Sequence, residues 1–188
     1  MADDLWGPRQ GPIGTWVSGG DGRDVSFPND QGKVAETLYR ERTIFKNLGP
    51  VDDGDQCLLG LDCRTSAYRG GEEKPFNSEF GCGLWDAANK RVTRGFVIQR
   101  AQALIAGATV ETDATSSTLA STTVSNTYRV LSNRHLDEIA HTTRFDFTIT
   151  LHDDTFAYDE TTVIEHHKYP TVIMHTDRTT LQLVSRDG

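Results

Sequence analysis

The chain has 188 residues, of which 36% are hydrophobic and 17 are glycine, and its formal net charge is −8. This length suits one domain with a sizeable core. The negative charge argues against a nucleic acid or an anionic membrane as partner, because both attract a basic surface. No apolar run approaches the ~20 residues of a membrane-spanning helix.

The beginning of the chain and its cysteines favour a cytoplasmic protein. The start Met1-Ala2-Asp3-Asp4 is acidic and unlike a signal peptide. Three cysteines, Cys57, Cys63 and Cys82, occur without a Cys-x-x-Cys pair. We expect them to be reduced, buried small side chains rather than disulfide partners or zinc ligands.

Residues 1–10 are predicted to be an N-terminal tail and residues 11–188 a single β-barrel ligand-binding domain. Gly14-Thr15-Trp16 opens the first strand. We expect Trp16 to plug one end of the barrel and Gly14 to let the chain bend beside it. In the N-terminal half, strand signals recur every ~8–12 residues, at residues 16–17, 33–45, 57–63, 80–85, 92–98 and from 104 onward. The charged Arg40-Glu41-Arg42 indicates that one face of residues 33–45 is polar or wet.

The C-terminal half shows a clearer alternation of apolar and polar residues. Strands are predicted at residues 116–124, 145–151, 156–164 and 171–184. Residues 131–141, with Ser132-Asn133 as a plausible N-cap, favour one short helix or lid. No repeat or domain boundary is visible. The sequence therefore predicts an all-β fold, a single antiparallel calycin-type β-barrel of about ten strands with an internal cavity.

The last strand carries the first candidate for a functional side chain. Counting in twos places several residues on one face, namely Ile173, His175, Asp177, Thr179, Leu181 and Leu183. If the apolar members point inward, His175 projects into the cavity. There a neutral imidazole can ligate a metal or haem iron, or hydrogen-bond a substrate. A core histidine bonded to a neighbouring carbonyl is the alternative.

Other candidates give weaker signals. The remaining histidines are expected at the surface, and no His-x-His pair indicates a zinc enzyme. Tyr39, Tyr128 and Tyr158 are pocket donors or packing residues at a barrel rim. Arg100 either faces a ligand carboxylate or propionate or is a solvated rim charge. Glu36 and Glu41 fall on opposite strand faces, which argues against shared acid–base work.

An ordered set of segments carries a family resemblance. Its members are Gly14-Thr15-Trp16, Tyr39-Arg40-Glu41 with Phe45, Gln56 before Leu58, Glu79-Phe80-Gly81 with Leu84-Trp85-Asp86, Arg100 with Ala106-Gly107, Leu131-Ser132-Asn133, Tyr158 with Thr161-Thr162, and His175-Thr176-Asp177-Arg178 before Leu181. Taken in order over residues 11 to 184, this set resembles the haem-binding β-barrel family, also called nitrobindin-like or fatty-acid-binding-protein-like. The chain departs from the family pattern at Asn77, at Cys82 and Gly83, and at Gln99.

The resemblance implies a ten-stranded barrel with ferric haem b at one open end. In that family a histidine of the last strands binds the iron, and His175 is the matching position. The implied cofactor-binding residues are His175, Arg100, Thr176, Phe147 and Tyr158, with Asp177 as a further supporting group and an apolar wall from Phe145, Phe147 and Ile149. The family's proteins bind nitric oxide and are linked to peroxynitrite breakdown, and an open sixth site would also admit peroxide.

Two alternatives remain open at this point. A haem-free calycin-type binder or pocket catalyst for an apolar small molecule would use Cys82, Gly83 and Tyr158 to shape its pocket, with His175 as an acid–base or hydrogen-bonding group. A structural or interaction protein would instead have its barrel filled by side chains. The sequence decides neither whether turnover occurs nor whether the barrel forms a homodimer.

Overall fold

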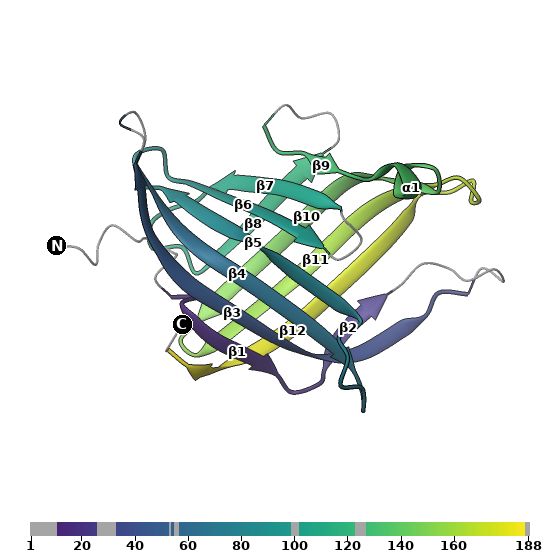
Figure 1. Cartoon of the computed structure of the whole chain (residues 1–188), viewed down its shortest axis with the longest axis horizontal. Coiled ribbons are helices and arrows are strands. Elements are labelled where there is room, and N and C mark those ends of the chain that lie inside the picture. The colour runs from purple at the N-terminus through teal and green to yellow at the C-terminus, as the bar shows by residue number, and fades with distance from the viewer. Residues whose placement is uncertain are drawn as a thin grey trace.

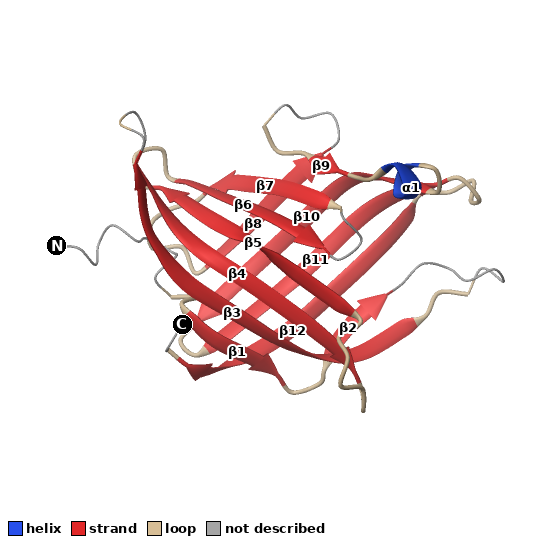
Figure 2. Cartoon of the chain, in the orientation of Figure 1, coloured by secondary structure: helices blue, strands red, loops and turns tan. Residues whose placement is uncertain are grey.

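The structure is a computed structural model that describes residues 11–25, 33–52, 54, 57–98, 102–122 and 127–186. Most of these residues lie in strands and only four lie in a helix, which confirms the predicted all-β fold (Figure 2). The elements in chain order are β1 (Gly14–Ser18), β2 (Gly22–Val25), β3 (Glu36–Asp52), β4 (Cys57–Arg69), β5 (Asn77–Asp86), β6 (Arg91–Ile98), β7 (Ala103–Thr109), β8 (Ser116–Thr122), β9 (Val130–Leu131), α1 (Arg134–Asp137), β10 (Ala140–His152), β11 (Thr155–His166) and β12 (Ile173–Ser185).

The sheet closes on itself as an antiparallel barrel (Figure 1). Strands β3 to β7 pair in sequence, as do β10 to β12. Strands β1 and β2 share one position, since each pairs with both β3 and β12. Strands β8 and β9 also share one position, because β7 pairs with β8 at Gly107 and with β9 at Ala103 and Leu104. The twelve strands thus occupy ten positions, as the strand spacing predicts.

Trp16 plugs the barrel as the sequence predicts. It is fully buried against Phe156 and Leu181, and its Nε1 donates to the Pro12 carbonyl at 2.7 Å. Gly14 beside it has a φ of +138°, and a Cβ there would lie 2.5 Å from the Ser185 carbonyl oxygen. Only glycine therefore lets β1 approach β12 this closely.

Alternation along the strands decides what lies inside the barrel. In β3, Arg40 and Arg42 are exposed, whereas Tyr39, Glu41 and Thr43 are buried. The polar face predicted for this strand is therefore partly the inner face. The apolar core gathers around Trp85, Phe96, Leu119, Phe145 and Phe147.

The expected short helix is present as α1, at one end of the barrel (Figure 1). The Asn133 side chain caps it by accepting from the Leu136 N–H at 3.0 Å, as the Ser132-Asn133 signal predicts. The helix spans only four residues because strand β10 begins at Ala140. No helix within the described ranges is long and apolar enough to cross a membrane.

The prediction for the cysteines is wrong in part. All three are free, but only Cys63 is buried, while Cys57 is exposed and Cys82 is half-buried. Cys57 is exposed because it is the first residue of β4, paired with Asp52 at the end of β3. In β5, Gly83 faces the barrel interior, and strand alternation turns Cys82 to the outer face.

Candidate functional site

The barrel interior holds two cavities of different chemistry. The larger, here called the polar cavity, has a volume of about 260 Å³ and lies among the first residues of β3, β5, β10 and β12. The smaller, here called the apolar cavity, has a volume of about 90 Å³ and lies among later residues of β3, β5 and β10, namely Phe45, Gly83, Ile149 and Leu151. Strands β3, β5, β10 and β12 are alternate strands of an antiparallel barrel, so they run in the same direction. Their first and later residues therefore lie toward opposite ends of the barrel.

Five carboxyl groups from five strands line the polar cavity. They are Asp24 of β2, Glu41 of β3, Glu79 of β5, Glu160 of β11 and Asp177 of β12. Each occupies an inward position of its strand, and Glu41 is only 2% exposed. Buried carboxyl groups are costly unless they are hydrogen-bonded, paired or protonated. Their concentration in one cavity therefore marks it as the candidate site.

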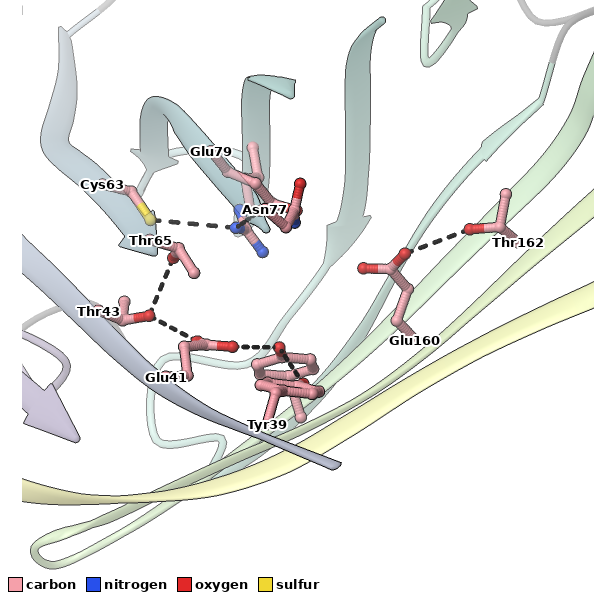
Figure 3. Close-up of polar contacts among 11 residues, drawn as sticks. Tyr39, Glu41, Thr43, Cys63, Thr65, Asn77, Glu79, Glu160 and Thr162 are labelled. Atoms are coloured by element: carbon pink, nitrogen blue, oxygen red, sulfur yellow. Dashed lines mark hydrogen bonds and ion pairs between the residues drawn. The ribbon is translucent and has the colours of Figure 1, made fainter. Parts of the chain in front are cut away.

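A continuous chain of hydrogen bonds joins Glu41 to Asp177 through Tyr158 and Tyr39. Figure 3 shows the Glu41 end of this chain, with Tyr39 and Thr43 beside it. Tyr39 Oη is hydrogen-bonded to Asp177 Oδ1 and lies 3.0 Å from Tyr158 Oη. Tyr158 Oη contacts Glu41 Oε2 at 2.6 Å. The other oxygen of Glu41 accepts from Thr43 Oγ1 at 2.7 Å. The sequence left these tyrosines as pocket donors or as packing residues at a rim. Tyr158 lines the polar cavity, and both Tyr39 and Tyr158 belong to a hydrogen-bonded network.

Arg94 supplies the positive charge at the boundary between the two cavities. Its side chain is 11% exposed, and its Nη2 lies 3.4 Å from Glu79 Oε2 and 3.9 Å from Cys63 Sγ. The guanidinium also lies over the rings of Phe96 and Phe147, at 4.6 and 4.4 Å from their centroids. Side chains around Arg94 line a gap of about 10 Å³ between the cavities. Arg94 therefore offsets part of the acidic charge.

Burial moves the carboxyl groups toward their protonated forms. It raises the pKa of Glu41 to about 7, although hydrogen bonds from Tyr158 and Thr43 act in the opposite direction. It raises the pKa of Asp177 to about 8, against the hydrogen bond from Tyr39 and with added repulsion from Glu41. Burial likewise raises the pKa of Glu79 and of Glu160. The cavity therefore holds carboxylic acids and carboxylates together near neutral pH.

His175 lies in the polar cavity, as counting in twos along β12 predicts. Its Nδ1 lies 2.8 Å from the Val25 carbonyl oxygen and 3.9 Å from Asp24 Oδ1. A carbonyl can only accept, so this contact places the proton on Nδ1 and leaves Nε2 as the atom that coordination would use. A core histidine bonded to a neighbouring carbonyl is also the alternative that the sequence analysis raised for His175.

The surroundings of His175 do not fit a haem. Strand pairing sets His175 beside Thr162, and Asp177 beside Glu160 and Asp24, all of which line the same cavity. A porphyrin needs apolar contact on its faces, and its propionates are anions that these carboxyl groups would repel. Arg69 is the one Lys or Arg side chain lining this cavity within the described ranges. Within the part of the chain that the structure describes, no group of three or more His, Cys, Asp or Glu side chains could hold a metal ion.

The structure separates the other predicted site residues. Tyr158 lines the polar cavity, whereas Phe147 belongs to the core between the cavities. Thr176 alternates with His175 and Asp177 and so faces the opposite side of β12. Arg100 lies outside the described residues. The three-residue apolar wall is divided, since Phe145 lines the polar cavity and Ile149 the apolar cavity.

The carboxyl cluster is the feature that reasoning from the sequence missed. Glu41, Glu79 and Glu160 stand on separate strands, far apart in the chain. Each glutamate does leave a local signal, because it lies two residues from side chains that point into the barrel, as Glu41 does from Tyr39 and Thr43. Only the closed barrel shows that these positions meet.

Comparisons with known proteins show the fold alone. No protein family model matches the chain, and no curated protein matches it. Among solved structures, the crystal structure of Rv2717c from M. tuberculosis has a TM-score of 0.63 and 14% sequence identity, with 92% of each chain covered. At that identity the likeness extends to architecture only. The chain is thus a closed antiparallel β-barrel.

Proposed function

We propose that this barrel binds a small organic molecule in the polar cavity without haem. The observation that supports it most is that carboxyl and apolar side chains line the same cavity. Glu41, Glu160 and Asp177 come from β3, β11 and β12, whereas Ile98, Leu104, Leu136 and Phe145 come from β6, β7, α1 and β10. A ligand that matches both kinds of lining has an apolar body and a polar head.

The size and charge of the cavity narrow the ligand further. The cavity volume of about 260 Å³ lies just below the ~300–1,000 Å³ that is typical of ligand pockets, so the ligand is small. The head faces groups that are acids or carboxylates, so it is neutral or positively charged. An anionic head would meet ionised carboxyl groups or force them to take up protons.

Three probes with one phenyl body and different heads test this proposal. We expect 4-phenyl-2-butanone and phenethylamine to bind more tightly than 3-phenylpropionate, by about tenfold, which equals ~1.4 kcal/mol. Isothermal calorimetry at pH 7 measures all three. Leu136→Gln, in α1 at the cavity, should weaken every probe, and the exposed Asp159→Asn should weaken none. Tightest binding of the carboxylate, or no effect of Leu136→Gln, would overturn the proposal.

A hemin titration separates this proposal from the function that the family resemblance implies. We expect no saturable one-to-one Soret band that depends on His175, and therefore the same spectra for wild type and His175→Ala. A one-to-one band that is lost in His175→Ala would refute haem-free binding. It would favour a haem site at His175 and chemistry on nitric oxide, peroxynitrite or peroxide.

A further inference from the structure

The hydrogen-bonded chain Asp177–Tyr39–Tyr158–Glu41, here called the relay, has an unusual proton count. Its four oxygens are joined by three contacts, from Tyr39 to Asp177, between the two tyrosines, and from Tyr158 to Glu41. Each hydrogen bond needs one proton, and the two phenols supply two. The third proton must come from a carboxylic acid at one end of the chain.

Two proton arrangements therefore satisfy all three contacts. In one, Asp177 is the acid and donates to Tyr39, Tyr39 donates to Tyr158, and Tyr158 donates to a Glu41 carboxylate. In the other, Glu41 is the acid and every donor and acceptor is reversed. A shift of three protons along the chain converts one arrangement into the other. The burial of Glu41 and Tyr39 shields these links from water.

We propose that the relay returns a proton from Glu41 to Asp177 and so lets the barrel isomerise a bound β,γ-unsaturated ketone. The proposal rests on ligand binding in the polar cavity, because both carboxyl groups line it. The Glu41 carboxylate takes a proton from the carbon between the carbonyl and the double bond, and that C–H bond breaks. The electron pair moves into a conjugated dienolate.

The second half of the reaction restores the charge balance. The dienolate takes a proton from the Asp177 acid at the far alkene carbon, where a new C–H bond forms and the double bond becomes conjugated. Glu41 is then the acid and Asp177 the carboxylate. Three protons shift through Tyr158 and Tyr39 and return the relay to its starting arrangement. No oxidant, reductant or cofactor is consumed.

The electrostatics of the cavity keep a proton on the relay. Burial raises the pKa of Asp177 to about 8 and that of Glu41 to about 7, so one of the two carboxyl groups retains a proton at neutral pH. Burial and the nearby carboxyl groups also raise the pKa of both tyrosines, which keeps the two phenols protonated. The other titratable or charged groups around the pair are Glu79 of β5, Arg69 of β4, Arg94 of β6, Glu160 of β11, Asp24 of β2 and His175 of β12.

Carbon-detected NMR of the carboxyl groups tests the relay without any ligand. We expect the carboxyl carbons of Glu41 and Asp177 to shift together over one pH interval, because they share a proton. Tyr39→Phe removes the middle link and should give each carbon a separate midpoint. Tyr68→Phe, which removes a phenol held by Arg40 away from the relay, should leave the joint titration intact. Independent titration in the wild type would overturn the relay.

Conversion of 3-cyclohexen-1-one to its conjugated isomer, followed by ultraviolet absorbance, tests the reaction. We expect the wild type to accelerate it, Tyr39→Phe and Tyr158→Phe to lose at least tenfold in rate, and Tyr68→Phe to match the wild type. Binding of this ketone without turnover refutes the reaction and leaves the proposed function standing. Failure of the ketone to bind, measured by calorimetry, counts against the proposed function itself.

Discussion

Glu41→Gln is the most informative single substitution, because glutamine has nearly the shape of protonated glutamate but cannot ionise. Glu41 is 2% exposed, and burial raises its pKa from 4.5 to about 7. The folded protein therefore holds this proton more tightly than the unfolded chain. The stability that this proton contributes is fully present below pH ~4.5 and is lost as the pH rises through about 7.

The magnitude follows from the size of the pKa change. A rise from 4.5 to about 7 corresponds to about 3 kcal/mol of folding free energy. We expect wild type and Glu41→Gln to have similar unfolding free energies at pH 5. At pH 8 the variant should be more stable by up to about 3 kcal/mol. Urea unfolding at several pH values, followed by tryptophan fluorescence, measures this difference.

The comparison between variants isolates Glu41 from the other acidic groups. Glu79 and Glu160 titrate in both proteins, so their contributions largely cancel in the difference. Asp177 titrates in both as well, but in the variant it loses the repulsion from Glu41. Glu36→Gln is the matched control, since Glu36 is on the same strand but exposed and paired with Arg23. Its difference from the wild type should stay within ~0.5 kcal/mol at every pH. A stability gain for Glu41→Gln that is the same at pH 5 and pH 8 would refute the reasoning.

Three further substitutions test the packing of the barrel. Trp16→Ala should cost about 3–5 kcal/mol in urea unfolding, because a fully buried indole is removed. Arg94→Met should lower the free energy of unfolding by about 3–5 kcal/mol, because it leaves Glu79 without its cation. Adding Glu79→Gln should recover much of that loss. A double variant as unstable as Arg94→Met would show that the ion pair is not the cause. Gly81→Ala should lower the melting temperature, since its Cβ would lie 2.1 Å from the Gly95 carbonyl oxygen, and an unchanged value would contradict this close approach.

The strand architecture could be read from local patterns, because a strand's two faces follow directly from its period of two. The alternation in residues 145–151 and 173–183 predicted the inward faces of β10 and β12. The Asn133 cap was equally local, since its acceptor and donor lie within three residues. Gly14 and Trp16 identified the plug for the same reason: the signal lies in one tripeptide.

The chemistry of the cavity could not be read in this way. Tyr39 and Asp177 are 138 residues apart, and Tyr158 and Glu41 are 117 apart, yet each pair shares a hydrogen bond. Such contacts depend on closure of the barrel and on the register of every intervening strand pair. From the sequence alone, a glutamate between two arginines is expected to be exposed to solvent. Only its alternation with buried residues along the strand indicates that it is buried.

The sequence by itself determined the fold class, the inward face of the last strand and the plugged end, because each depends on neighbours within a few residues. Only the tertiary structure decided that five carboxyl groups line one cavity with Arg94 beside them, and that His175 lies among these acids. The physical reason is that burial and charge pairing are set by side chains from many strands at once.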